Sequence, residues 1–298
     1  MASLTSEPRF PAHRIAIGVP CFNEEARIPA LLRALEQLDP APGVVLVVDD
    51  GSTDRTAALL DAAPVELLRH TRNEGLGSAR NTLWREARKR GFALIAFLDA
   101  DTTPPTDWLA RVGALFAEDP RLAGVGGRNV DPLNDGGRRP DQWRARFWKQ
   151  DLGEEPLIDA PMLVGACSTY RTDALHDVAG FDARFRTNGE DVDVGRRLRA
   201  GGWRLRYDPS LVVEHRRRDG ARSLVSLCFR HCRDGMRATR RTPEESPGAF
   251  ELVTGMGRKA LTAPAAALVK RRDPLEAALG AAACGAGLLG YAVGWVRP

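Results

Sequence analysis

The sequence predicts an α/β fold in which a mainly parallel central sheet is flanked by helices. From residue 14 onward, short runs of consecutive apolar residues alternate with stretches whose apolar residues have the i, i+3, i+4 spacing of a helix. Runs without polar alternation are typical of strands buried on both faces, as in a parallel sheet covered by helices. At 298 residues, the chain is long enough for one large domain with a substantial core.

The first half of the chain contains four such runs, each followed by a polar loop. Strands are expected at 14–19, 44–48, 65–69 and 93–98, and helices at about 28–38, 56–60 and 108–116, with a further helix ending near residue 89. The polar loops are 20–25, 49–54, 73–81 and 99–101. Because the carboxyl ends of parallel strands meet at one edge, an open α/β sheet binds its ligand there. We therefore expect these loops to form the ligand site.

Asp99 and Asp101 follow the apolar run ALIAFL and are separated by one alanine. Residues two apart on an extended chain point to the same side, and a buried strand normally excludes charge. Carboxylates with little His or Cys nearby suit a hard cation such as Mg2+ or Mn2+, which would in turn hold a phosphate. The alternative is that one carboxylate caps the next helix, near Thr106, while the other is solvated. From these residues alone both interpretations stay open.

The second half of the chain interrupts the alternation with a long irregular insert. Strands are expected at 122–127, 162–170 and 203–207, with a helix from Asp191 to Arg199. The insert, residues 129–161, is rich in Gly, Pro, Asp and Arg and carries Trp143 and Trp148. Long irregular segments in compact domains are usually functional. We expect this one to form a lid or a wall of the ligand site.

The last part of the chain is basic and then apolar. His215 precedes three arginines, Arg216 to Arg218, and a helix is expected at about 222–240. Residues 275–296 contain one acid, Glu276, and are long enough to span a membrane. The spacing of Gly290 and Gly294 favours close helix packing. A membrane helix and a packed or interfacial terminal helix are therefore both open.

Composition limits the remaining possibilities. The net charge is only +4, and neither aromatic-interleaved basic motifs nor a recognition-helix signal is present, so we do not expect nucleic-acid binding. The five cysteines are scattered without paired CxxC motifs, and the helical cluster Cys228, His231, Cys232 lacks an apparent fourth metal ligand. The first residues contain no apolar signal-like run. We expect a reducing, cytoplasmic location, with the basic and apolar end favouring attachment to the cytoplasmic face of a membrane.

Five motifs together resemble the family-2 inverting glycosyltransferases of GT-A fold. They are VPCFNEE at 19–25, VVDDGSTD at 47–54, NEGLGSARN at 73–81, LDAD at 98–101 and GED at 189–191. They occur in the family's order, and the resemblance covers about residues 14–210. It implies a flexible N-terminus (1–12), a GT-A catalytic domain (13–215) and a basic helical C-terminal extension (216–298) that ends in the apolar helix 275–296.

The resemblance also implies roles for individual residues. The donor would be a nucleotide-sugar, commonly a UDP-sugar, and a divalent metal, Mg2+ or Mn2+, would bridge its diphosphate. The implied nucleotide-binding residues are Pro20, Phe22, Asn23, Glu24, Asp49, Asp50, Gly75, Arg80 and Asp99. The implied metal ligands are Asp101 and His215. The implied catalytic residues are Asp191, as the base that takes the acceptor hydroxyl's proton, and its neighbour Glu190.

Three further expectations concern the reaction. A carboxylate at a helix N-terminus is stabilised as the anion, so we expect Asp191 to act as a base through its geometry more than through a raised pKa. The QxxRW motif of processive synthases is absent at 230–234, which favours the transfer of one sugar per encounter. The insert tryptophans and the basic tail suit a lipid-linked hydroxyl acceptor, since Trp stacks on sugars and Arg binds lipid phosphate.

Two other functional classes remain as alternatives. A sugar-phosphate nucleotidyltransferase would use a similar sheet, but it normally begins with a Gly-rich phosphate loop that does not follow the first strand here. A non-catalytic nucleotide-sugar-binding subunit or membrane scaffold would retain the fold without turnover. The presence of both Asp101 and Asp191 argues against that second class.

Overall fold

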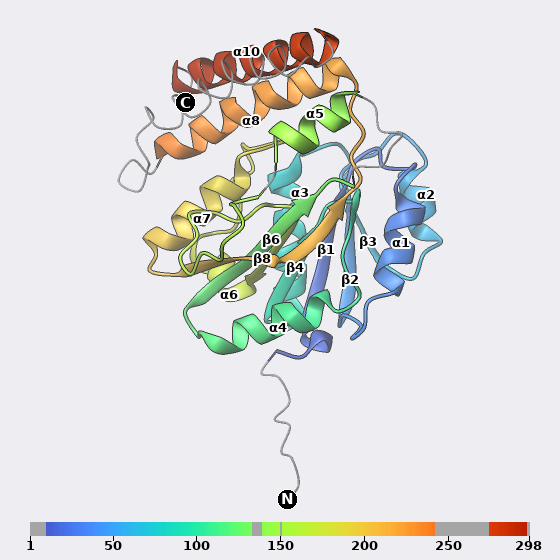
Figure 1. The fold of residues 1–298 in the computed structure, drawn as a ribbon. Helices are drawn as coiled ribbons and strands as arrows, with labels where there is room; N and C mark the ends of the chain where they lie inside the picture. Colours follow the sequence, from blue (N-terminus) through green and yellow to red (C-terminus); the bar gives the residue numbers. More distant parts are fainter. Residues whose placement is uncertain (1–9, 133–138, 150, 242–273, 297–298) are drawn as a thin grey trace, which may run out of the picture.

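The computed structural model describes residues 10–132, 139–149, 151–241 and 274–296. The described strands form one eight-stranded sheet in the order β3-β2-β1-β4-β7-β6-β8-β5, with helices on both faces (Figure 1). The predicted α/β class is therefore confirmed.

The first four long strands pair in parallel and lie where the apolar runs predicted them. Their bounds are β1 (Ile15–Cys21), β2 (Val44–Asp49), β3 (Glu66–Arg69) and β4 (Leu94–Leu98). The helices between them are α1 (Ile28–Glu36), α2 (Thr56–Asp61) and α3 (Leu76–Lys89). Because these strands are parallel, their polar loops meet at one edge of the sheet, as expected.

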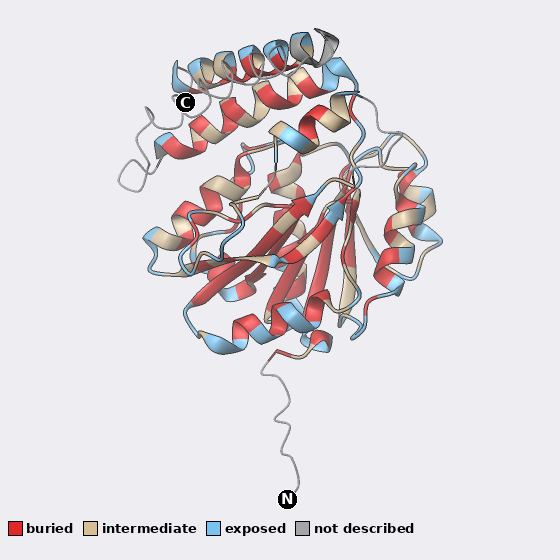
Figure 2. Ribbon diagram, viewed as in Figure 1, coloured by how far each residue is buried: buried red, intermediate tan, exposed pale blue. Residues whose placement is uncertain are grey.

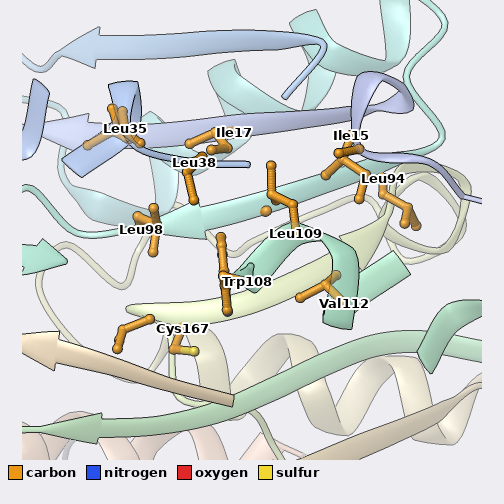
Figure 3. Close-up of a cluster of buried hydrophobic side chains, with 14 of the residues drawn as sticks. Ile15, Ile17, Leu35, Leu38, Leu94, Leu98, Trp108, Leu109, Val112 and Cys167 are labelled. Carbon is orange, nitrogen blue, oxygen red and sulfur yellow. The ribbon is translucent and has the colours of Figure 1, made fainter. Parts of the chain in front are cut away.

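Both faces of this sheet are buried. Leu94 and Leu98 of β4 face a core that includes α4 (Trp108–Glu118), and Figure 3 shows Trp108 and Leu109 of that helix over them. The alternate β4 residues, such as Ile95, belong to a second core with α3, α6 (Thr172–Asp177) and α7 (Glu190–Ala200). Burial on both sides explains why these strands carry no alternating polar residues.

The second half of the sheet differs from the prediction in two ways. It comprises β5 (Thr102–Thr103), β6 (Leu122–Val130), β7 (Cys167–Arg171) and β8 (Arg204–His215). The expected strand at 162–170 is shorter and later, and it runs antiparallel between β4 and β6. The expected strand at 203–207 continues to His215, past a register shift against β6. The polar residues Asp208 and Ser210 at that shift break the apolar run, which made the strand look shorter.

The insert and the C-terminal extension form a layer above the sheet. Its helices are α5 (Arg139–Phe147), α8 (Ala221–Arg241) and α10 (Pro274–Val296), and α10 lies along α8 on the side away from the sheet (Figure 1). The insert is thus partly helical, contrary to the irregular segment that was expected. Trp143 of α5 packs against Leu224 of α8 and Ala283 of α10, which ties the three helices together.

The two glycines of α10 allow the close packing that their spacing predicted. A Cβ atom added at Gly290 would lie 2.3 Å from the carbonyl oxygen of Phe229, and one at Gly294 would lie 2.3 Å from that of Arg233. Over the described residues, the segment Ala278–Val296 is the one helix long and apolar enough to cross a membrane, and 33% of it is buried. Its outer face is exposed along much of its length (Figure 2).

The beginning of the described chain is packed. Phe10 lies edge-on to Phe116, with ring centroids 6.2 Å apart, and the guanidinium of Arg171 sits over its ring. Residues 10–12 were expected to be flexible, but this contact and the short helix η1 (Ala12–Arg14) hold them against the domain. Residues 1–9 lie outside the described part. All five cysteines lie in the described part of the chain, where they are buried and are not joined in disulfides.

Candidate active site

Two neighbouring cavities lie at the carboxyl edge of the parallel strands. The first cavity has a volume of about 660 Å³ and is lined by Pro20, Phe22, Glu24, Asp50, Gly75 and Asp101, among others. The second cavity has a volume of about 350 Å³ and is lined by Arg80, Trp148, Glu190, Asp191 and His231, among others. Asp99, His215 and Arg217 line both cavities. The structure therefore brings most of the predicted site residues into one continuous space.

Asp50 shapes the wall of the first cavity. Its carboxylate accepts hydrogen bonds from the backbone N–H groups of Glu74 (2.9 Å) and Gly75 (2.8 Å), and it lies 2.6 Å from Nδ1 of His70. Gly75 has a φ of +98°, and a Cβ there would meet the backbone of Arg186 at 2.8 Å, so a side chain does not fit. Asp50 thus holds the 73–75 loop in place.

The side chains of Asn23 and Asp49 accept hydrogen bonds from the backbone of the 49–54 loop. Oδ1 of Asn23 accepts a hydrogen bond from the backbone N–H of Thr53 (2.8 Å), and Oδ1 of Asp49 accepts one from that of Ser52 (3.0 Å). As far as the described residues go, neither side chain contributes to the lining of the two cavities. A direct contact of these two residues with a nucleotide stays a prediction.

Arg80 lines the second cavity and pairs with two of its carboxylates. It is only 1% exposed, and its guanidinium reaches Oε1 of Glu190 (2.5 Å) and Oδ1 of Asp99 (3.3 Å). The same guanidinium lies over the rings of Phe97 and Phe181, which limit the movement of the Arg80 side chain. Burial raises the pKa of Asp99, while the positive charge of Arg80 opposes that shift. Arg80 therefore holds a carboxylate from each side of the site.

Asp101 and His215 lie together because β5 pairs with β8. Thr102 stands opposite His215, and Nε2 of the imidazole is 3.3 Å from Oδ1 of Asp101. Burial disfavours the charged form of both residues, but the hydrogen bond and the charge of His215 outweigh it and lower the pKa of Asp101 to about 2. In the same way, Asp101 and Asp131 outweigh the effect of burial on His215 and raise its pKa to about 9.

The donor set of Asp101 and His215 fits a divalent cation. A carboxylate oxygen and an imidazole nitrogen suit Mn2+ and, for the oxygen, Mg2+. Over the described residues, no group of three or more His, Cys, Asp or Glu side chains is arranged to hold a metal ion, the Cys228, His231, Cys232 cluster included. The two side chains would thus supply part of a coordination shell, and a ligand such as a diphosphate would complete it.

Glu190 and Asp191 begin α7 at the side of the second cavity. Oδ2 of Asp191 accepts a weak hydrogen bond from the backbone N–H of Gly165 (3.3 Å). Burial raises the pKa of Asp191 despite the opposing charge of Arg80 and the helix N-terminus. The expectation that the helix N-terminus stabilises this carboxylate as the anion was therefore wrong in its net direction, because desolvation outweighs the helix dipole. Burial and the charge of Asp191 also raise the pKa of Glu190, whose Oε2 is buried without a hydrogen-bond partner among the described residues.

Comparison with known proteins identifies the family. The family model described as glycosyl transferase family 2 matches residues 16–179, more than half of the chain. The chain belongs to glycosyl transferase family 2. This confirms the resemblance that the five motifs indicated.

Two curated glycosyltransferases of Mycobacterium tuberculosis are similar to this family-2 chain in sequence. It is 33% identical over 239 residues to the pre-mycofactocin glycosyltransferase of Mycobacterium tuberculosis H37Rv, covering 74% of this chain and 46% of that protein. It is 32% identical over 222 residues to the N-acetylglucosaminyl-diphospho-decaprenol L-rhamnosyltransferase of the same strain, covering 63% and 72%. The chain thus spans about half the length of the first of these curated relatives.

Solved structures show the same fold at low sequence identity. The mannosyltransferase PcManGT from Pyrobaculum calidifontis, in complex with GDP-Man and Mn2+, aligns with a TM-score of 0.63 at 20% identity over 96% of this chain and 88% of that one. Residues 1–349 of TarS from S. aureus, in complex with UDP-GlcNAc, align with a TM-score of 0.51 at 15% identity over 93% and 89%. These likenesses confirm the GT-A fold.

Several residues of the family-2 site were missed by the sequence interpretation. The family model ends at residue 179, and the missed residues lie either in the insert or beyond that point. They are Asp131, Arg217, Arg230 and His231. Arg217 was noticed in the basic run but was related to lipid phosphate, and His231 was noticed only beside two cysteines. Asp131 and Arg230 carry no motif, and the docking of α5 and α8 onto the sheet brings them to the site. Trp148, which was related to sugar stacking, lines the second cavity.

Arg217 and Arg230 make one side of the first cavity positive. Nε of Arg217 lies 2.9 Å from Asp219, and Nη1 of Arg230 donates a hydrogen bond to Ser226. Burial and the charges of Arg217 and Arg233 lower the pKa of Arg230. This crowding of cations is favourable for a bound anion such as a phosphate.

Proposed function

We propose that this family-2 chain is an inverting glycosyltransferase that moves one sugar from a UDP-sugar to a hydroxyl group of an acceptor, with Mg2+ or Mn2+. The observation that carries the proposal is that Asp101 lines the first cavity, Asp191 lines the second, and Asp99 lines both. The first cavity would hold the nucleotide, and the second would hold the acceptor. A donor sugar at their junction would then lie between a base and the site of its leaving group.

The residues divide the reaction between them. Asp191 takes the proton of the acceptor hydroxyl, whose oxygen forms a bond to the anomeric carbon while the bond from that carbon to the diphosphate oxygen breaks. Attack and departure occur on opposite faces of the sugar, so the configuration inverts. Asp101 and His215 would hold a metal ion that neutralises charge on the departing diphosphate. Arg217 and Arg230, which also line the first cavity, would stabilise the same charge.

The nucleotide can be tested directly. The proposal rests on the family resemblance and on the positive wall, and the structural neighbours' names include both UDP-GlcNAc and GDP-Man as bound donors. Thermal unfolding with UDP, GDP, dTDP and UMP in the presence of Mn2+ should show the largest rise in melting temperature for UDP. A ligand at a hundred times its dissociation constant stabilises the fold by about 2.7 kcal/mol. An equal response to UMP would contradict engagement of the diphosphate, and no response to any nucleotide would favour a scaffold.

The acceptor is proposed to be lipid-linked, and the chain is proposed to lie on the cytoplasmic face of a membrane. The outer face of α10 exposes Leu289 (59%) and Trp295 (50%), and the guanidinium of Arg240 stacks on the Trp295 ring. Trp and Arg side by side suit the headgroup region of a bilayer. One relative's name includes a diphospho-decaprenol acceptor, which supports this acceptor class.

Membrane attachment predicts a specific effect of one surface substitution. Leu289→Asp places a charge on the outer face of α10, so co-sedimentation with anionic phospholipid vesicles should fall strongly. Ile158→Asp is the matched control, because Ile158 is also exposed but lies in the insert away from α10. Equal vesicle binding by the two variants would contradict attachment through α10.

A further inference from the structure

A buried ion-pair cluster connects the insert with the metal side of the site. Arg144 of α5 is 2% exposed. Its Nη1 lies 2.5 Å from Oδ1 of Asp131, its Nε lies 2.9 Å from Oδ2 of Asp219, and its Nη2 donates a hydrogen bond to the carbonyl oxygen of Arg217 (3.0 Å). Burying charged groups is costly, and such clusters are weak evidence for stability. The cluster is therefore better explained by the residues that it holds in place than by a gain in stability.

Asp131 reaches from this cluster to His215. Its Oδ1 lies 3.6 Å from Nδ1 of the imidazole, while Nε2 on the other side of the ring lies 3.3 Å from Asp101. His215 is 4% exposed, so its ring has little freedom to turn. Because Nδ1 faces Asp131, Nε2 faces Asp101 and the first cavity, where a bound cation would take the place of the Nε2 proton. That is the orientation that a metal-binding histidine needs.

Arg144 determines where the Asp131 carboxylate points. The same oxygen, Oδ1, faces both Arg144 and His215, so the guanidinium fixes the atom that the imidazole meets. Arg144 is held in turn by α5, whose neighbouring residue Trp143 is buried against α8 and α10. The orientation of His215 thus depends on the insert helix rather than on β8 alone.

We propose that Asp131, fixed by Arg144, is a positioning residue that orients His215 for metal binding. The inference rests on the proposed function, because it assumes a divalent cation at Asp101 and His215. Metal-binding histidines commonly donate their second N–H to a carboxylate, which fixes the tautomer and raises the basicity of the ligating nitrogen. Neither the motifs nor the family resemblance assigns a role to either residue.

The test is the affinity for Mn2+, measured by calorimetry on the full chain saturated with UDP. Asp131→Asn should weaken Mn2+ binding by about 10–100-fold, as removal of such a partner does elsewhere, and should leave the affinity for UDP without metal unchanged. Arg144→Lys should weaken Mn2+ binding in the same direction, because a single ammonium group cannot reach Asp131, Asp219 and the Arg217 carbonyl oxygen from three fixed directions as the planar guanidinium does. Glu154→Gln is the matched control, since Glu154 is an exposed acid of the same insert whose partners among the described residues are Arg128 and Lys149, outside the Arg144 cluster.

A double-mutant cycle separates positioning from a general effect on folding. In a His215→Ala background, Asp131→Asn should cause no further loss of Mn2+ affinity, because its effect passes through the imidazole. An equal loss in both backgrounds, or wild-type Mn2+ affinity in both Asp131→Asn and Arg144→Lys, would overturn this inference while leaving the proposed function standing. Failure of the wild-type protein to bind Mn2+ with UDP would overturn both.

Discussion

Asp191→Asn is expected to reduce kcat by about 10²–10⁴-fold, the usual contribution of a general base, while UDP binding stays unchanged. Asparagine keeps the shape of the side chain and can keep one of its two backbone N–H contacts, to Gly165 or to Val192, but it cannot take a proton from the acceptor. The measurement is steady-state transfer from the donor identified by the nucleotide screen, together with calorimetry of UDP.

The control for Asp191 is a second carboxylate in the first turn of α7. Asp193 also lies at the positive end of the helix, but it pairs with Arg197. Asp193→Asn should therefore keep most of the activity. If both variants lost activity equally, Asp191 would be a helix-capping residue and not the base.

The raised pKa of Asp191 predicts the acid side of the pH profile. A base must be deprotonated to work, so kcat/KM should rise with pH through the pKa of this carboxyl. Because burial raises that pKa above the usual value of an aspartic acid, activity should be lost at a higher pH than for an exposed carboxylate. An acid limb at the ordinary value would contradict the desolvated environment.

Arg80→Met should lower the free energy of unfolding by about 3–5 kcal/mol, the typical cost of removing one partner from a buried ion pair. Glu190, whose side chain is 3% exposed, would lose its cation in a site shielded from water, and Asp99, whose side chain is 34% exposed, would lose the same cation with partial access to solvent. Denaturant unfolding at neutral pH measures the effect. Arg88→Met is the matched control on the same helix, because Arg88 and its partner Asp173 are exposed and should contribute only about 0–1 kcal/mol.

The loss caused by Arg80→Met should itself depend on pH. Without Arg80, the pKa values of Glu190 and Asp99 rise further in the folded state, so the folded state favours their protonated forms. The variant should therefore be destabilised most at high pH and should recover as the pH falls through the raised pKa of Glu190. Destabilisation that is independent of pH would indicate lost packing against Phe97 rather than unpaired carboxylates.

The fold could be predicted where burial on two faces leaves a mark in the sequence. The runs that became β1, β2 and β4 are apolar throughout because helices cover both sides of them. The place and direction of β7 could not be predicted, since antiparallel pairing with β4 and β6 depends on distant residues. Helix α5 was missed because its sequence is mostly polar and its burial comes from contacts of Trp143 with the C-terminal helices.

The site was predictable to the extent that its residues lie in local motifs. Asp99, Asp101 and Asp191 stand at the ends of elements whose patterns were clear, and the structure places all three around connected cavities. Arg230 and Asp131 could not be predicted, because they reach the site only when α8 and the insert dock onto the sheet. Burial of Asp191, which reverses its expected pKa, is likewise a property of the folded chain.

The most direct test of the account is calorimetric binding of UDP with and without Mn2+ to the wild-type protein and to Asp101→Asn. The wild type should bind UDP tightly only when Mn2+ is present, because the ion would join Asp101 and His215 to the diphosphate. Asp101→Asn should lose this dependence, whereas Asp107→Asn, an exposed acid paired with Arg111 on the next helix, should retain it. Binding of UDP that ignores Mn2+ in the wild type, or Mn2+ dependence that survives in Asp101→Asn, would contradict the metal-diphosphate site.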